Sequence, residues 1–321
     1  MRFLLSIFVL AFFGVSVAIA GADETAPSLI ANGQVDEAIA ELQGQINVTP
    51  NDARAHNLLC RAYFSLSEWD NGISECEKAV NLAPQNSQYH LWLGRVYGEK
   101  ADGSGFMKAA ILARKVKNQF ETAVQLNPRN IDARTDLAEF YLEAPSVVGG
   151  GLDKAVQQAN SLAEIDPAAA DWVKGRLAEK QGDFATADRE YHDAIAASHG
   201  SASAWLNLGI FYKHRSDFDQ MDKALRHVRS APLDRPDALV DAAEILIHTQ
   251  RNLPEAAELL RAYINSNDKV EQAPVFRVYY LLGIADEKLG ETRNAANEYK
   301  TALAMAKEFR PAQEALERIS R

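Results

Sequence analysis

Four side chains in the N-terminal third of the chain have types and spacing that could do chemistry. Arg61 and Arg95 lie 34 residues apart, and Cys60 and Cys76 are the only cysteines. Two guanidinium groups on one surface, helped by Arg54, can bind a carboxylate through paired N–H donors. Two cysteines can form a disulfide if their backbones come close enough. The sequence therefore offers a candidate anion site and a candidate covalent link.

The other polar residues do not form a catalytic or metal-binding pattern. The seven histidines include no His-Glu-x-x-His pair, and no Gly-x-Ser-x-Gly turn surrounds a serine. Two cysteines are too few for a cysteine-rich metal centre. His56 and His90 lie 34 residues apart, each at a position on a helical stripe where an aromatic ring normally packs. We therefore expect no enzyme activity, no cofactor and no metal.

The composition excludes several classes of protein. The chain has 321 residues, of which 47% are hydrophobic and 24% charged, so it is long and apolar enough to fold. With 34 basic and 44 acidic residues its net charge is −10. Nucleic-acid phosphates require a cationic surface, so the charge argues against a nucleic-acid partner.

The first twenty residues have the three parts of an export signal. A basic start at Arg2 precedes the apolar run 3–17, and Ala18-Ile19-Ala20 provides a small-x-small end. We expect a signal peptide over residues 1–20, cleavage after Ala20, and no membrane span in the mature protein. The alternative is an uncleaved membrane anchor, because residues 3–20 are just long enough to cross a bilayer. Cleavage would leave the protein soluble and extracytoplasmic.

The remainder of the chain is one repeated motif. Landmarks 34 residues apart include Pro50 and Pro84, Leu59 and Leu93, Tyr63 and Tyr97, and Gly175 and Gly209. Within residues 202–231, one helical stripe contains Trp205, Leu208, Gly209 and Tyr212, and a second contains Met221, Leu225 and Val228. A period of this length indicates stacked helix pairs, in which each proline stops a second helix and glycines such as Gly94 let paired helices approach closely.

Residues 77–84 and 205–209 resemble the end and the first helix of a tetratricopeptide repeat. The resemblance covers nearly all of residues 21–321 and is closest to exported bacterial arrays of this type. It implies an all-α, right-handed superhelix of about eight helix-turn-helix units, with a closing helix at about residues 310–320. The units begin near Thr25, Asp52, Ser87, Ile131, Ala168, Ala202, Asp237 and Phe276.

Two units carry insertions between their helices, near residues 98–115 and 144–151. Because successive units stack in parallel, both insertions should emerge on the same edge. Residues 98–118 contain five basic and two acidic residues. This edge is a second candidate surface for an anion or a partner, and its alternative role is a structural lengthening. Its candidate residues are Lys108, Arg114, Lys115 and Lys117.

The resemblance also implies which residues face the concave groove, namely the fifth and ninth of each first helix. The candidate partner-binding residues are Arg61, Arg95, Trp172, Leu206, Ile210, Ile245, Tyr280 and Ile284. The groove would be polar in its first half and largely apolar in its second. In the alternative interpretation, the apolar residues pack on neighbouring helices and the arginines pair with Glu139 or Glu143.

The two cysteines give conflicting indications. They lie on the two antiparallel helices of one unit, and pairing those helices about their turn places Cys60 level with Gly72 and Ile73. The resulting offset of about one turn from Cys76, added to a helix spacing of ~8 Å, exceeds the Cα separation that a disulfide tolerates. An oxidising compartment favours a bridge. Both outcomes stay open.

Together these patterns predict a non-enzymatic scaffold in the bacterial cell envelope, located in the periplasm. It would bind a peptide or a helix of another protein in its concave groove, because a rigid curved surface loses little entropy on binding. The alternative is a module for a non-protein envelope ligand, a glycan or an anionic lipid, that uses Trp172, Tyr280 and the basic insertion edge. Neither pattern identifies the partner.

Overall fold

The computed structural model describes residues 22–320, and this part of the chain is entirely helical. It contains seventeen α-helices, one short 3-10 helix and no strand. The predicted signal peptide lies outside the described residues. Among the described helices, none is both long and apolar enough to span a bilayer.

The helices form eight consecutive pairs followed by a single closing helix, as predicted. The pairs are α1 (Ala22–Ala31) with α2 (Val35–Val48), α3 (Ala53–Ser65) with α4 (Trp69–Leu82), α5 (Ser87–Asp102) with α6 (Phe106–Leu126), α7 (Ile131–Glu143) with α8 (Leu152–Ala163), α9 (Pro167–Gln181) with α10 (Phe184–Ala197), α11 (Ala202–His214) with α12 (Phe218–Val228), α13 (Ala238–Thr249) with α14 (Leu253–Asn265) and α15 (Val275–Lys288) with α16 (Thr292–Met305). The closing helix is α17 (Arg310–Ile319).

The first helices of five units begin at a polar capping residue. Each of these side chains accepts a hydrogen bond from a backbone N–H in the first helical turn, which stabilises the helix start by about 1 kcal/mol. The capping residues are Asp52, Asn86, Asn130, Asp166 and Ser201. The sequence thus determines where these five helices of the inner layer start.

Glycine allows the two helices of a unit to pack closely. A Cβ atom on Gly94 of α5 would lie 2.4 Å from the ring of Phe120 on α6. On Gly209 of α11 it would lie 2.7 Å from Leu225 on α12. No side chain fits at these distances, so the glycines set the spacing of the pair.

Tyrosines connect the helices at regular positions. Five hydroxyl groups donate to carboxylates on a neighbouring helix, in the pairs Tyr97–Glu77, Tyr141–Glu121, Tyr191–Glu179, Tyr212–Asp188 and Tyr299–Glu287. Burial followed by the hydrogen bond to the carboxylate raises the pKa of Tyr97 and Tyr141 above the ordinary value. These bonds orient the layers on which the candidate site lies.

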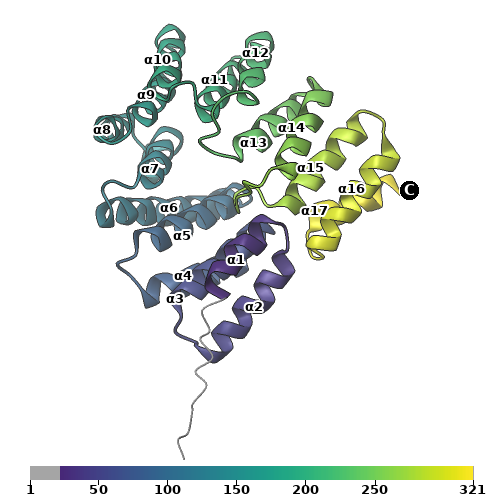
Figure 1. Ribbon diagram of the computed structural model, residues 1–321. Coiled ribbons are helices and arrows are strands. Elements are labelled where there is room, and N and C mark those ends of the chain that lie inside the picture. The colour runs from purple at the N-terminus through teal and green to yellow at the C-terminus, as the bar shows by residue number, and fades with distance from the viewer. Residues whose placement is uncertain (1–21, 321) are drawn as a thin grey trace, which may run out of the picture.

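The array closes on itself, so that its first and last units are in contact (Figure 1). Ile30 and Val35 of the first pair share a hydrophobic cluster with Phe276 of α15. Gly33 has a φ of +87°, and a Cβ there would lie 2.9 Å from the backbone nitrogen of Phe276. The sequence predicted a closing helix at an open end. The structure instead forms a ring, because the apolar face of the first pair covers that of the last.

The two insertions lie side by side, as the stacking of units predicted. The first lengthens α5 and α6, and α6 is a helix of 21 residues. The second forms the 3-10 helix η1 (Ser146–Val148) between α7 and α8. Residues of both insertions line one cavity of about 380 Å³.

Cys60 and Cys76 form a disulfide between α3 and α4, with Cα atoms 5.3 Å apart. The estimate of the axial offset was therefore wrong. It treated the helices as straight rods at a fixed spacing, but a Cβ on Gly72 of α4 would lie only 3.5 Å from the carbonyl oxygen of Cys60. This close approach brings the two cysteines within bonding range.

Candidate functional site

The candidate site is the inner wall of the ring, formed by the first helix of each unit. Two loops, 229–237 and 266–274, reach from the outer layer towards the middle of the ring (Figure 1). Gln272 of the second loop lines a cavity together with residues of α3 and α5. Arg235 of the first loop lines another together with residues of α7, α9 and α11. Both loops therefore border cavities on the wall between α3 and α11.

The first cavity contains the arginines predicted to bind an anion. Arg61 of α3 and Arg95 of α5 lie over the ring of Trp92, with guanidinium carbons 4.9 and 5.2 Å from its centroid. The cavity has a volume of about 450 Å³ and is also lined by Arg54 and Asn57. Planar guanidinium groups stack well on an indole ring, which fixes their donors in one orientation. These five residues are called the arginine site below.

The arginine site has unmet capacity for negative charge. Burial and the nearby charges of Arg95 and Arg54 lower the pKa of Arg61 to about 10. Asn57 is only 3% exposed, and its amide nitrogen has no hydrogen-bond partner among the described residues. A buried donor without a partner carries a desolvation cost. An anion in the cavity would reduce both the repulsion and this cost.

Acidic side chains of the same chain already form ion pairs with Arg61 and Arg95. Glu271 of the loop 266–274 forms an ion pair with Arg61. Asp136 of α7 accepts a hydrogen bond from Arg95 at 2.6 Å, and Asp132 lies 3.6 Å from the same guanidinium. Internal pairing, the alternative interpretation, thus applies to both arginines, but their partners are not Glu139 and Glu143, which pair with Arg176. The contact with Glu271 demonstrates that Arg61 accepts a carboxylate that reaches it from across the ring.

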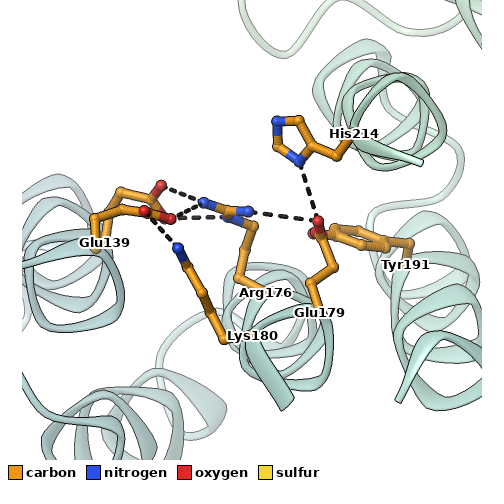
Figure 2. Close-up of polar contacts among 7 residues, drawn as sticks. Glu139, Arg176, Glu179, Lys180, Tyr191 and His214 are labelled. Atoms are coloured by element: carbon orange, nitrogen blue, oxygen red, sulfur yellow. Dashed lines mark hydrogen bonds and ion pairs between the residues drawn. The ribbon is translucent and has the colours of Figure 1, made fainter. Parts of the chain in front are cut away.

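Further along the wall a charged cluster connects α7, α9 and α11 (Figure 2). The guanidinium of Arg176 lies between Glu139 on one side and Glu179 on the other, at 2.6 and 3.5 Å. We call this set the Arg176 cluster; its members are Glu139, Glu143, Arg176, Glu179, Lys180 and His214. They line a polar cavity of about 700 Å³.

The Arg176 cluster stabilises the ionised form of its most buried carboxylate. Burial disfavours the charge of Glu179, but hydrogen bonds from His214 and Tyr191 and the charge of Arg176 outweigh it. The pKa of Glu179 is consequently lowered. Burial likewise disfavours the charge of Arg176, yet Glu139 raises the pKa of that guanidinium above its ordinary value. The cluster is internally paired and joins three inner helices.

Trp172 faces the second cavity, of about 590 Å³, at the opposite end of the same helices. Its other lining residues include Thr135 and Asn207 on the wall and Arg235 from the loop 229–237. The indole therefore lies where the repeat register predicted it. The cavity combines an aromatic face with hydrogen-bonding groups, which suits an extended peptide.

Of the five apolar residues predicted for the second half of the groove, two lie in the core and three are partly buried. Leu206 is 2% exposed and Ile245 is 6% exposed, so neither can contact a partner. Ile210 is half-buried against the same core cluster. Tyr280 packs against Tyr299 and Phe309, and Ile284 packs against the cluster that contains Tyr299. The alternative interpretation, packing on neighbouring helices, thus describes Leu206 and Ile245, whereas Ile210, Tyr280 and Ile284 also keep part of their surface exposed.

The basic residues of the insertion edge lie on α6 and differ in their contacts. Lys115 lies 3.6 Å from Glu77 and over the ring of Tyr97, and Lys117 lies 3.9 Å from Glu121. Lys108 and Arg114 are exposed and form no ion pair within residues 22–320. The edge is therefore only partly neutralised.

Trp92 of the arginine site and Glu271, the partner of Arg61, were not predicted from the sequence. Trp92 directly follows the groove position Leu91, and the repeat register gave no reason to turn it towards the arginines. Glu271 lies in a loop 210 residues from Arg61. No local signal connects them, because the contact depends on the closure of the ring.

The comparisons with known proteins agree with this architecture. The family model described as "Tetratricopeptide repeat" matches residues 24–87 and 173–220. The yeast protein Tom70 is similar over 98% of this chain and 67% of its own, with a TM-score of 0.55 and 13% identity. A tetratricopeptide repeat protein from Parabacteroides merdae is similar over 82% of this chain and 97% of its own, with a TM-score of 0.49 and 12% identity. No curated protein matches the sequence. At such identities the likeness to Tom70 shows the fold alone.

Proposed function

We propose that this chain, a tetratricopeptide repeat protein, is a non-enzymatic scaffold that holds an acidic segment of another protein. The segment lies along the inner wall from α3 to α11, with one carboxylate at the arginine site. Trp172 and the polar residues of the second cavity contact the rest of the segment. The wall is rigid, since ion pairs and the Cys60–Cys76 disulfide fix its helices, so binding costs little ordering of the scaffold.

The observation that carries this proposal is a pair of buried donors at the arginine site, Arg61 Nε and Asn57 Nδ2, that have no hydrogen-bond partner among the described residues. Arg54, Arg61 and Arg95 converge on one cavity, and Asn57 adds a buried amide donor without a partner. Glu271 already supplies one carboxylate from the same molecule. A partner's carboxylate would either displace Glu271 from Arg61 or occupy the cavity beside it, and both arrangements use charge-assisted hydrogen bonds.

Site-directed photocrosslinking in cells tests the proposal. A crosslinking residue at Asn207, in the second cavity, should capture a partner protein. The double variant Arg61→Gln/Arg95→Gln should reduce this capture more than tenfold, because each charge-assisted hydrogen bond contributes about 1.5–3 kcal/mol.

The matched control is Lys223→Gln/Arg226→Gln on the exposed surface of α12, which removes the same charge away from the wall. Capture should persist in this control. Capture that is equally strong in the arginine double variant, or the absence of any captured protein at Asn207, would contradict the proposal.

The proposed compartment is the periplasm. The export signal in residues 1–20 supports it. The Cys60–Cys76 disulfide supports it independently, because disulfides persist mainly in oxidising compartments. Cell fractionation, with mass measurement of the purified protein, tests both parts. A soluble periplasmic chain that begins at Gly21 is expected; a cytosolic chain that retains residue 1 would contradict the proposal.

Of the alternative ligands, a glycan or an anionic lipid, the glycan has weaker support than a peptide. A glycan site needs accessible aromatic faces, and Trp172 and Tyr280 were the candidates. Tyr280 instead packs against Tyr299 and Phe309. Trp172 alone would provide one stacking face, and the lining of its cavity suits a peptide as well. The protein scaffold therefore remains the function that the geometry supports best.

A further inference from the structure

Large apolar side chains are exposed together at the insertion edge. Phe106 is 88% exposed, Met107 80%, Val147 73% and Ile111 59%. Phe106 and Met107 occupy the first turn of α6, and Val147 belongs to η1 of the neighbouring insertion. Exposing several such side chains at one place costs solubility, so an apolar patch of this kind usually serves contact with another body.

The patch lies at the tip of the longest helix pair. The helices α5 and α6 have 16 and 21 residues, and the turn between them contains Gly103, Ser104 and Gly105. Other units have helices of 10 to 15 residues. The extra turns place Phe106 and Met107 at the end of this pair, where both side chains are exposed. The tip is therefore accessible to a partner surface.

The same segment is cationic on an acidic protein. Residues 103–120 contain Lys108, Arg114, Lys115 and Lys117 but no Asp or Glu, while the whole chain has a net charge of −10. At helical spacing Arg114 follows Met107 by seven residues and Ile111 by three, so these three share one face of α6. Met107, Lys108, Ile111 and Arg114 are all exposed. This face combines apolar and cationic side chains without acidic ones.

A shallow groove extends the apolar surface towards the second insertion. It is the cavity of about 380 Å³, and its lining includes Phe106, Ala109, Ala110, Ala113 and Val147. Met107 and Ile111 do not line it. A partner helix in the groove would leave these two side chains in water. A flat apolar phase that receives the whole tip would cover all of them.

We propose that the insertion edge docks on the surface of an anionic phospholipid bilayer. Phe106 and Met107 enter the boundary between headgroups and acyl chains, where an amphipathic helix face is stable. Lys108 and Arg114 face the lipid phosphates, and each such cation near an anionic surface strengthens binding about fivefold. The docking is independent of the proposed function, because it uses neither the arginine site nor Trp172.

Fluorescent labelling at the tip tests the proposal. Cys60 and Cys76 are bonded to each other, so in the full-length variant Met107→Cys only the introduced thiol reacts with an environment-sensitive dye. Vesicles of phosphatidylcholine with phosphatidylglycerol should shift the emission to the blue, and spin-labelled lipids should quench it. The same dye at Val48→Cys, which is 74% exposed at the end of α2, should show neither effect. A dye at Met107 that stays in water would overturn the proposal.

The contribution of the cationic side chains to docking is measured by titrating the labelled protein with anionic vesicles and following the emission of the dye at Met107→Cys. This readout is needed because the apolar run 3–17 of the full chain can bind vesicles by itself. The variant Lys108→Gln/Arg114→Gln should weaken docking on anionic vesicles about 30-fold. The control Lys223→Gln/Arg226→Gln has the same net charge and should dock like the parent chain.

Circular dichroism establishes that each labelled variant is folded. Equal losses in the edge variant and the α12 control would overturn the proposal, since net charge alone would then explain them. A photocrosslinker at Ile111 should react with lipid in such vesicles and in cells. Capture of a protein there in place of lipid would also overturn it and would assign the edge to a protein partner.

Discussion

The two halves of the inner wall use the same repeat positions for different purposes. In α5, α7 and α9 the ninth residues of the first helices are Arg95, Glu139 and Arg176. Arg95 pairs with Asp136 of α7, and Glu139 pairs with Arg176. In α13 the equivalent residue is Ile245, which is 6% exposed. This position is therefore part of a charged surface in one half of the wall and is buried in α13 of the other half.

The cause of the difference is the pair of loops that enter the ring. Ala231 of the loop 229–237, and Val270 and Ala273 of the loop 266–274, belong to the hydrophobic cluster that contains Ile245. These residues cover α13, and they leave the wall from α3 to α11 open. A repeat position thus determines the direction of a side chain, while a loop determines whether solvent reaches it.

The largest change in stability is expected when a negative charge is placed in each half of the wall. Ile245→Asp should destabilise the fold by roughly 5 kcal/mol, because it removes a buried apolar side chain and buries an unpaired carboxylate. Asn207→Asp puts the same charge on the open wall and should change the free energy of unfolding by less than about 1 kcal/mol. Urea denaturation followed by circular dichroism measures both. A mild effect at Ile245 would mean that this half of the wall is accessible.

The regular part of this architecture could be predicted from the sequence. The 34-residue period identified eight helix pairs, and Gly94 and Gly209 identified where paired helices touch. Both depend on contacts within a unit or between neighbours, which repeat with the sequence.

The remaining features depend on contacts that do not repeat. Arg61 meets Glu271 only because the ring closes, and Ile245 is buried where two irregular loops cover α13. The disulfide was undecided because an offset of about one helical turn is sensitive to helix spacing, which Gly72 reduces locally. The sequence thus predicted the arginines of the candidate site, but it did not predict the loops that cover part of the wall.

An intermediate effect is expected when the Arg176 cluster is disrupted. Arg176→Gln leaves three carboxylates without their shared cation and should lower the free energy of unfolding by about 2 kcal/mol at pH 7. The loss is smaller than for a fully buried ion pair because Glu139 and Glu143 are partly exposed. Arg176→Lys keeps the charge and should lose less. Equal losses would show that shape, and not charge, is what Arg176 contributes.

The cluster also predicts a pH dependence in the charged half. The pKa of Glu179 lies below its ordinary value of 4.5 in the folded chain, so its ionised form stabilises the fold. This contribution is fully present above pH 4.5 and is lost as the pH falls through the lowered pKa. Glu179→Gln should therefore lose less stability than the parent chain on acidification from pH 5 towards pH 3. Parallel acid titrations of the two proteins would contradict this assignment.

The smallest expected effect concerns Asp241 of α13, in the other half of the wall, and it increases stability on acidification. Burial raises the pKa of Asp241 to about 6. The negative charges of Asp237 and Glu244 add to this shift, and the attraction of Arg235 opposes it. The folded chain then binds more protons than the unfolded chain between pH 3.8 and about 6, so this group increases stability as the pH falls through that window. Because the side chain is 42% exposed, the gain should stay below about 1 kcal/mol. Asp241→Asn should abolish it, and denaturation at pH 7 and pH 5 measures the difference. If the gain survives in that variant, Asp241 is not its source, and the two halves of the wall do not respond oppositely to acid.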